Sequence, residues 1–290
     1  MLLTPFQLVA SVVRRFHAER YAQTAAALSF ATLLGLVPML VVGAVLLENL
    51  PFGIKLSAAL ENFLLATLLP DKAGTVIVKY LGQFAHRADQ VTWIGLIVLA
   101  MTALLQMLTI EHAFNAIWQV KKRRPWLRRL ALHLLALLAG PLVFGGALAS
   151  ITFLASVSFG LVDEPRWLRV VFAQAMPLIF LVLLFSLMYS VLPNRLVSLW
   201  HAGVSGVLAA LAFVGMQRLF ALYVVKFPTY TLIFGAFSAI PIFLLWLYLS
   251  WTVILMGALL TAEMPGLTQR GRTGGQERAS KIGPTKNQKR

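Results

Sequence analysis

Long apolar runs alternate with short polar segments along the chain, and this pattern predicts an all-α integral membrane protein. Each run holds about 18 residues or more, which lets a helix cross a hydrocarbon core of about 30 Å. Helices are the expected form because open sheet edges leave backbone groups without partners in lipid. We predict a membrane domain over 25–262 with six transmembrane helices, at 25–47, 93–110, 130–157, 169–192, 200–222 and 233–260.

The segments outside these runs have weaker patterns. In residues 1–24, apolar side chains recur at helical spacing, which predicts a cytoplasmic amphipathic helix in the membrane interface; the alternative is an extension of the first span. The stripe consists of Phe6, Val9, Val13 and Phe16. The external loop 48–92 carries two similar patterns, so we expect short helices there. The tail 263–290 is rich in Gly, Gln and basic residues, and we expect it to be disordered.

Composition sets the class of protein and narrows its chemistry. The 290 residues are 59% hydrophobic and 12% charged, with a mean hydropathy of +0.82. Soluble domains are about 45–50% apolar and about 25% charged. The absence of cysteine excludes disulfides, thiolate metal sites and cysteine nucleophiles. The formal net charge of +15 lies mostly in loops and the tail, so we expect anionic lipid headgroups, and no nucleic acid, as partners.

One basic loop orients the predicted helices. It follows the second span and contains Lys121, Lys122, Arg123, Arg124, Arg128 and Arg129. Lys and Arg near the ends of spans stay on the cytoplasmic side of a membrane. With this loop inside, the cytoplasmic segments hold 17 of the 25 basic residues and the external segments hold 7. Both termini are therefore predicted to be cytoplasmic.

Prolines and small residues recur within the predicted spans. The prolines are Pro38, Pro141, Pro177 and Pro241, in the first, third, fourth and sixth spans. Each removes a backbone donor and favours a kink. Their distribution matches two inverted halves of three spans, an arrangement found in transporters, and coincidence is the alternative. Small residues every four positions indicate close packing within one chain or, alternatively, a homo-oligomer.

The few polar residues within the spans are the candidate site residues. An ionisable group in the membrane interior costs at least about 2.5 kcal/mol, so it invites a functional explanation. The candidate substrate path consists of Gln106, Glu111, Asn115, Trp118, Gln217 and Arg218. Glu111, Asn115 and Trp118 are spaced four and three residues apart, so they share one helical face. The alternatives are a salt bridge from Glu111 to the basic loop and snorkelling of Arg218 to the outer headgroups.

The sequence lacks the residue patterns of common enzyme sites. Its five histidines are scattered, and it contains no H-x-x-x-H pair, acidic cluster, nucleophile elbow or Walker loop. We therefore expect no catalytic residues, no metal, no cofactor and no ATPase.

Four stretches carry a likeness to a known family. They are AAALSF at 25–30, AFNAIW at 113–118, LPNR at 192–195 and FGA at 234–236. In order and spacing they resemble the YihY/BrkB family of bacterial inner-membrane proteins, over roughly residues 10–262. The resemblance implies six spans in the inner membrane, and some members are linked to export of envelope lipids. The family was once labelled ribonuclease BN.

Three hypotheses about function follow. The favoured one is a transporter or lipid-translocating protein of the cell envelope without its own ATPase. The alternative is a structural or assembly protein whose polar residues only pack. A ribonuclease is the weakest hypothesis, because no metal-binding nuclease site can be assembled from the sequence. A continuous polar cavity favours the first hypothesis, and a tightly packed bundle favours the second.

Overall fold

The computed structural model describes residues 5–48, 93–120, 125, 127, 166–226 and 239–282. Several predictions concern residues outside these ranges. They are the helices of the external loop, the third span with Pro141, and the basic residues Lys121, Lys122, Arg123, Arg124, Arg128 and Arg129.

Six α-helices make up the described part of the chain, and no strand occurs in it, which confirms the all-helical prediction. They are α1 (Pro5–Ala18), α2 (Tyr21–Glu48), α5 (Trp93–Ile117), α7 (Arg166–Val191), α8 (Leu199–Lys226) and α10 (Ala239–Ile282). Three described stretches are long and apolar enough to cross a membrane, and they are Ile97–Ile117, Leu199–Val224 and Ile240–Met264. Helices α2 and α7 contribute shorter apolar stretches, Tyr21–Leu36 and Pro177–Val191.

Helix α5 extends beyond its predicted end. The predicted span stops at residue 110, but the helix continues to Ile117. The added turns include Glu111 and Asn115. Polar side chains indicate a loop only when they face water. Here Glu111 is buried and the two side chains are hydrogen-bonded to each other, so the helix continues through them.

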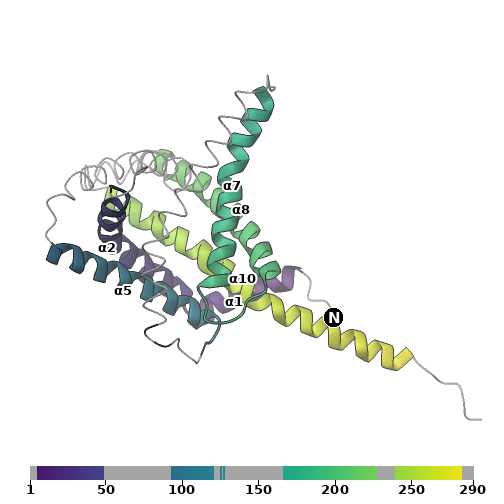
Figure 1. Cartoon of the computed structure of the whole chain (residues 1–290). Helices are drawn as coiled ribbons and strands as arrows, with labels where there is room; N and C mark the ends of the chain where they lie inside the picture. The colour runs from purple at the N-terminus through teal and green to yellow at the C-terminus, as the bar shows by residue number, and fades with distance from the viewer. Residues whose placement is uncertain are drawn as a thin grey trace, which may run out of the picture.

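Helix α10 lies at the centre of the arrangement. It packs against α2, α8 and α1, and its C-terminal part extends beyond the other helices (Figure 1). Helices α7 and α8 form an antiparallel pair joined by the turn at 192–198, and α5 packs on α2. The α2–α5 pair and the α7–α8 pair therefore meet mainly through α10.

A chain of aromatic side chains forms the core between α5, α7, α8 and α10. Its members are Phe114, Tyr189, Phe185, Phe213, Trp246 and Phe220, and all are buried. Successive ring centroids lie 5.0–6.4 Å apart, with stacked, tilted and edge-to-face orientations. Aromatic rings prefer such spacings, so these contacts add to the stabilisation from packing.

The small residues of α8 and α10 pack within the chain. A Cβ atom built on Gly206 would lie 2.2 Å from the hydroxyl of Ser186, and one on Gly257 would lie 2.2 Å from the hydroxyl of Tyr189. Ala202 is also buried. Small residues at these positions let helix backbones approach closely. The described contacts agree with packing within one chain and leave the homo-oligomer a prediction.

Helix α1 is separate from α2, so the first span does not simply extend to the N-terminus. Arg20 has a φ of 56°, a left-handed conformation that breaks the helix. The predicted apolar stripe is also divided: Phe16 is buried with Val12, but Val9 and Val13 are 57% and 38% exposed. Helix α1 packs against α10, but this contact leaves Val9 and Val13 exposed, so only part of the apolar face is covered.

One feature of α10 differs from the prediction and another stays a prediction. Pro241 is the third described residue of α10 and the residues just before this helix lie outside the described ranges, so a kink there stays a prediction. Pro38 and Pro177 do lie inside their helices. The tail was expected to be disordered, yet α10 continues to Ile282 (Figure 1). A helix that has already formed extends without a new nucleation cost.

Candidate functional site

The inner turns of α5 bring two of the predicted site residues together. The side chain of Glu111 is only 2% exposed. The amide nitrogen of Asn115 donates to Glu111 Oε1 at 3.3 Å, and Asn115 Oδ1 accepts from the backbone N–H of Asn194 at 2.8 Å. Asn194 lies in the turn between α7 and α8, so Asn115 joins α5 to the other helix pair. This turn contains the LPNR stretch at 192–195.

Trp118 directly follows the end of α5 and belongs to the aromatic core. Its ring stacks on Phe114 with the centroids 6.3 Å apart and the planes 10° apart, and it is 7% exposed. The described contacts of Trp118 are thus those of a packing residue.

Gln106 forms a second polar cluster one and a half turns earlier on α5. When its amide is oriented so that each atom has a matching partner, the nitrogen donates to Ala31 O at 2.9 Å and the oxygen accepts from the Thr32 hydroxyl at 3.0 Å. Trp251 Nε1 of α10 also donates to Thr32 Oγ1, at 3.0 Å. Gly35 leaves room for this amide, since a Cβ atom there would lie 3.1 Å from Gln106 Cγ. The cluster joins α2, α5 and α10.

A third polar cluster, which the sequence analysis missed, surrounds Arg15 of α1. Its Nη1 lies 2.9 Å from Glu263 of α10, its Nη2 donates to Ile117 O at 2.8 Å, and its Nε lies 2.6 Å from Glu19. Because Ile117 is the last residue of α5, its carbonyl has no partner within that helix, and a cation suits the negative helix end. Arg15 therefore holds α1, α5 and α10 together at one end of the structure.

The contacts of this cluster lower the pKa of the Glu19 carboxylate. Burial by itself raises the pKa of Glu19, but hydrogen bonds from Arg15 and Tyr21 outweigh it and lower the pKa below its ordinary value. Only the spacing of Arg15 and Glu19, four residues apart on a helix, gave a sequence signal for this cluster. Glu263 lies 248 residues from Arg15, beyond the reach of any periodicity.

Gln217 and Arg218 lie apart from the α5 clusters. Both are on α8, where Gln217 is half-buried and Arg218 is exposed. The described residues therefore place the six candidates in separate clusters rather than in one continuous polar cavity. Passage of a substrate along them stays a prediction.

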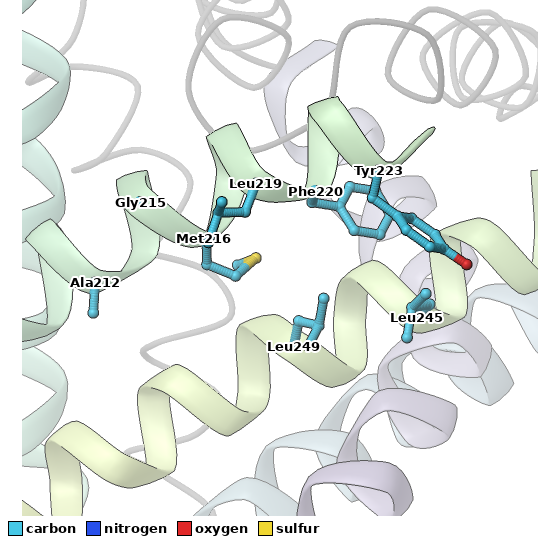
Figure 2. Close-up of a pocket in the computed structure, with 8 residues that line it drawn as sticks. All are labelled: Ala212, Gly215, Met216, Leu219, Phe220, Tyr223, Leu245 and Leu249. Atoms are coloured by element: carbon cyan, nitrogen blue, oxygen red, sulfur yellow. The ribbon is translucent and has the colours of Figure 1, made fainter. Parts of the chain in front are cut away.

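An open apolar groove lies between α8 and α10 (Figure 2). Its volume is about 560 Å³. The lining residues are Ala212, Gly215, Met216, Leu219, Phe220 and Tyr223 of α8 with Leu245 and Leu249 of α10. None of the six candidate residues lines it. The sequence analysis missed the groove because apolar residues in a span look alike until the pairing of helices is known.

No group of three or more His, Asp or Glu side chains gathers to hold a metal ion within the part of the chain that the structure describes. The absence of metal, cofactor and catalytic residues from the whole chain stays a prediction.

Comparison with known proteins agrees with the family resemblance. The chain is 46% identical to a UPF0761 membrane protein of Aromatoleum aromaticum and 48% identical to one of Azoarcus sp., over 89% of this chain and 63% of each relative. A UPF0761 membrane protein of Nitrosospira multiformis is 39% identical over 90% of this chain. The chain spans about three fifths of the length of these relatives. No solved structure matches it.

The family model described as virulence factor BrkB matches residues 12–282, which is nearly the whole chain. Together with the apolar helices and the names of the relatives, this match shows a multi-pass membrane protein. The chain belongs to the BrkB family.

Proposed function

We propose that this chain is a six-span protein of the bacterial inner membrane that moves a lipid-like, amphipathic substrate and has no ATPase of its own. The observation that carries the proposal is the buried carboxylate of Glu111 in a helix that contains no Lys, Arg or other carboxylate. A carboxylate in a membrane helix is costly, so it is retained where it serves transport or proton transfer. If proton transfer at Glu111 drives transport, the chain needs no ATPase of its own, and this is the coupling role that we propose for Glu111.

The described contacts support the proposed topology. Arg15, the end of α5, the α7–α8 turn and Glu263 are linked by hydrogen bonds, so they lie at one end of the structure. Helix α2 leaves this end, α5 and α7 run toward it, α8 leaves it and α10 returns. With both termini cytoplasmic, this end faces the cytoplasm, and one further crossing between α5 and α7 completes six spans.

The orientation can be tested because the chain has no cysteine of its own. Leu196 is fully exposed in the α7–α8 turn, so a Leu196→Cys variant offers a single reactive thiol. We expect a membrane-impermeant maleimide to label this variant in inside-out vesicles and not in intact cells. Labelling in intact cells would reverse the proposed orientation.

A structural role is the second candidate, and one observation favours it. Asn115 bonds to the backbone of the α7–α8 turn, and Trp118 is packed in the core. Hydrogen bonds between membrane helices contribute about 0.6 kcal/mol each on average, so such contacts stabilise a scaffold without any substrate. We do not propose a ribonuclease activity, because no described cluster supports it.

Transport is tested with purified full-length chain in vesicles that contain phosphatidylglycerol labelled on its tail with a dithionite-sensitive fluorophore. We expect the chain to move the label between leaflets faster than in protein-free vesicles, with or without an imposed pH gradient. Glu111→Gln removes the carboxylate and keeps the shape, so it should reduce exchange to the protein-free rate. Glu19→Gln, the same change in the turn after α1, is the matched control and should retain exchange.

Two outcomes contradict parts of this proposal. Equal exchange by the wild-type chain and Glu111→Gln would exclude a coupling role for this carboxylate. No exchange by well-folded wild-type chain would exclude translocation of this lipid and favour the structural candidate.

A further inference from the structure

Asn115 presents a donor to the Glu111 carboxylate, and the orientation of this donor is set outside α5. Its Oδ1 accepts from the backbone N–H of Asn194 at 2.8 Å. A backbone N–H can only donate, so this bond decides which end of the Asn115 amide is oxygen and which is nitrogen. The amide nitrogen is therefore directed at Glu111 Oε1, which accepts from it at 3.3 Å. The α7–α8 turn thus determines which group Asn115 offers to Glu111.

The two bonds form a relay through a single amide group. Hydrogen bonds in a chain polarise one another, so donation by the Asn115 nitrogen makes its oxygen a stronger acceptor for the Asn194 N–H. A hydrogen bond to an ionised carboxylate is about twice as strong as one between neutral groups. Glu111 is 2% exposed and Asn115 is half-buried, so little water is at hand to replace a weakened bond. Loss of the charge on Glu111 therefore weakens both bonds of the relay.

The relay ends on a turn that moves with its helices. Pro193, just before Asn194, is buried, and its ring fixes the backbone φ at that position. Helix α7 packs mainly on α8, and α5 packs mainly on α2. Phe114 of α5 also stacks on Tyr189 of α7 with the centroids 6.4 Å apart, but aromatic contacts accept a range of offsets. The directional bond from Asn194 to Asn115 is thus the contact that fixes the position of the turn on α5.

We propose that Asn115 is a positioning residue that couples the charge of Glu111 to the attachment of the α7–α8 turn to α5. The turn is held while Glu111 is ionised. When Glu111 takes up a proton and becomes a neutral carboxylic acid, the relay weakens and the α7–α8 pair is released to move relative to α5. This inference rests on the proposed function for proton transfer at Glu111, and it adds the part of the structure that responds to the proton.

The sequence offers a selective probe of the Asn194 N–H. Asparagine follows proline at one place in the chain, Pro193–Asn194. Full-length chain labelled with ¹³C-carbonyl proline and ¹⁵N-asparagine therefore gives a single carbonyl-correlated amide signal. The rate at which this signal disappears in deuterated water measures how firmly the N–H is bonded. Substitutions at 111 and 115 leave the sequence around Asn194 unchanged, so they do not alter its intrinsic hydrogen-exchange rate.

Variants of the relay should change this rate in a definite order. Glu111→Gln keeps the shape and removes the charge, so hydrogen exchange at Asn194 should become about threefold faster. Asn115→Leu removes both bonds and should make it about tenfold faster. Asn115→Gln carries the same two groups on a longer stem and should restore part of the protection. Glu19→Gln, the matched control, should leave the rate unchanged. Equal size-exclusion profiles of the variants exclude misfolding as the cause.

The outcomes separate coupling from packing. If Asn115 only packs, Asn115→Leu will speed hydrogen exchange at Asn194 and Glu111→Gln will leave it at the wild-type rate, which would overturn the coupling. An unchanged rate in both variants would overturn the relay, and an equal acceleration by Glu19→Gln would reduce it to a general loosening of this end.

The coupling and the proposed transport can also fail independently. Faster hydrogen exchange in Glu111→Gln, in a chain that moves no lipid between leaflets, contradicts the transport and leaves the coupling intact. Loss of lipid movement in Glu111→Gln without any change at Asn194 contradicts the coupling and leaves the transport intact.

Discussion

Replacing Gly257 with valine is expected to prevent α7, α8 and α10 from packing closely. Even a Cβ atom at this position would lie 2.2 Å from the Tyr189 hydroxyl and 2.9 Å from Ala209 Cβ. Tyr189 is fully buried, and its hydroxyl donates to Ile254 O at 3.1 Å, so the ring cannot turn away without losing that bond. Overpacking costs about 1–3 kcal/mol, and leaving a buried polar group unpaired costs about 1–3 kcal/mol more. Thermal unfolding in detergent should show the loss.

Two further variants identify the cause. Gly203→Val adds the same side chain to α8 where there is space, and it should unfold close to the wild-type temperature. Tyr189→Phe removes the atom nearest to position 257, so it should partly rescue Gly257→Ala, in which the added group is a single methyl. A double-mutant cycle then measures the interaction between the two positions. Independent effects of Gly257→Ala and Tyr189→Phe would contradict this explanation.

Replacing Arg15 with glutamine is expected to release α1 from the inner end of the structure. The change removes a charge that bonds to Glu19, Glu263 and the Ile117 carbonyl, and hydrogen bonds to charged groups contribute about 1.5–3 kcal/mol. Partial exposure of both carboxylates lowers this contribution. Spin labels on single cysteines at Val9 and Leu196 should report a broader distance distribution in Arg15→Gln than in the parent chain.

Arg15→Lys is the control for charge. A lysine has one ammonium group and cannot direct separate N–H donors at three acceptors, so it should give an intermediate distribution. The pKa of Glu19 is lowered in the folded chain, so its contribution is complete at neutral pH and is lost as the pH falls through the folded-state pKa. A narrow distribution in Arg15→Gln would show that apolar contacts of Val12 and Phe16 hold α1 without the ion pairs.

Local pattern was enough to predict the described helices but not their contacts. The length of the apolar runs identified the helices α2, α5, α7, α8 and α10. A membrane helix forms all its backbone hydrogen bonds internally and presents apolar side chains to the lipid, so a long apolar run predicts one. The four-residue spacing of Glu111 and Asn115 predicted that they share a face, and their hydrogen bond agrees. The end of α5 was missed because polarity alone does not tell a loop from a buried, hydrogen-bonded turn.

Features that depend on helix pairing were beyond prediction from the sequence. The bond from Asn115 to Asn194 crosses 79 residues, and the partner is a backbone N–H group that every sequence contains. Trp118 was grouped with a polar path, but its indole stacks in the core because Phe114 lies one turn away on the same face. Gly215 of α8 and Leu249 of α10 both line the groove, but nothing in the sequence near either residue indicates that the two helices pair there.

The ion pair between Arg15 and Glu263 also orders events during synthesis. The ribosome makes Arg15 first, and its partner follows 248 residues later. Because chains are made and inserted from the N-terminus, α1 must wait with part of its apolar face uncovered until α10 has entered the membrane. Docking of α1 is therefore a late assembly step, and a chain truncated before residue 263 should expose α1 to proteases that recognise unfinished membrane proteins.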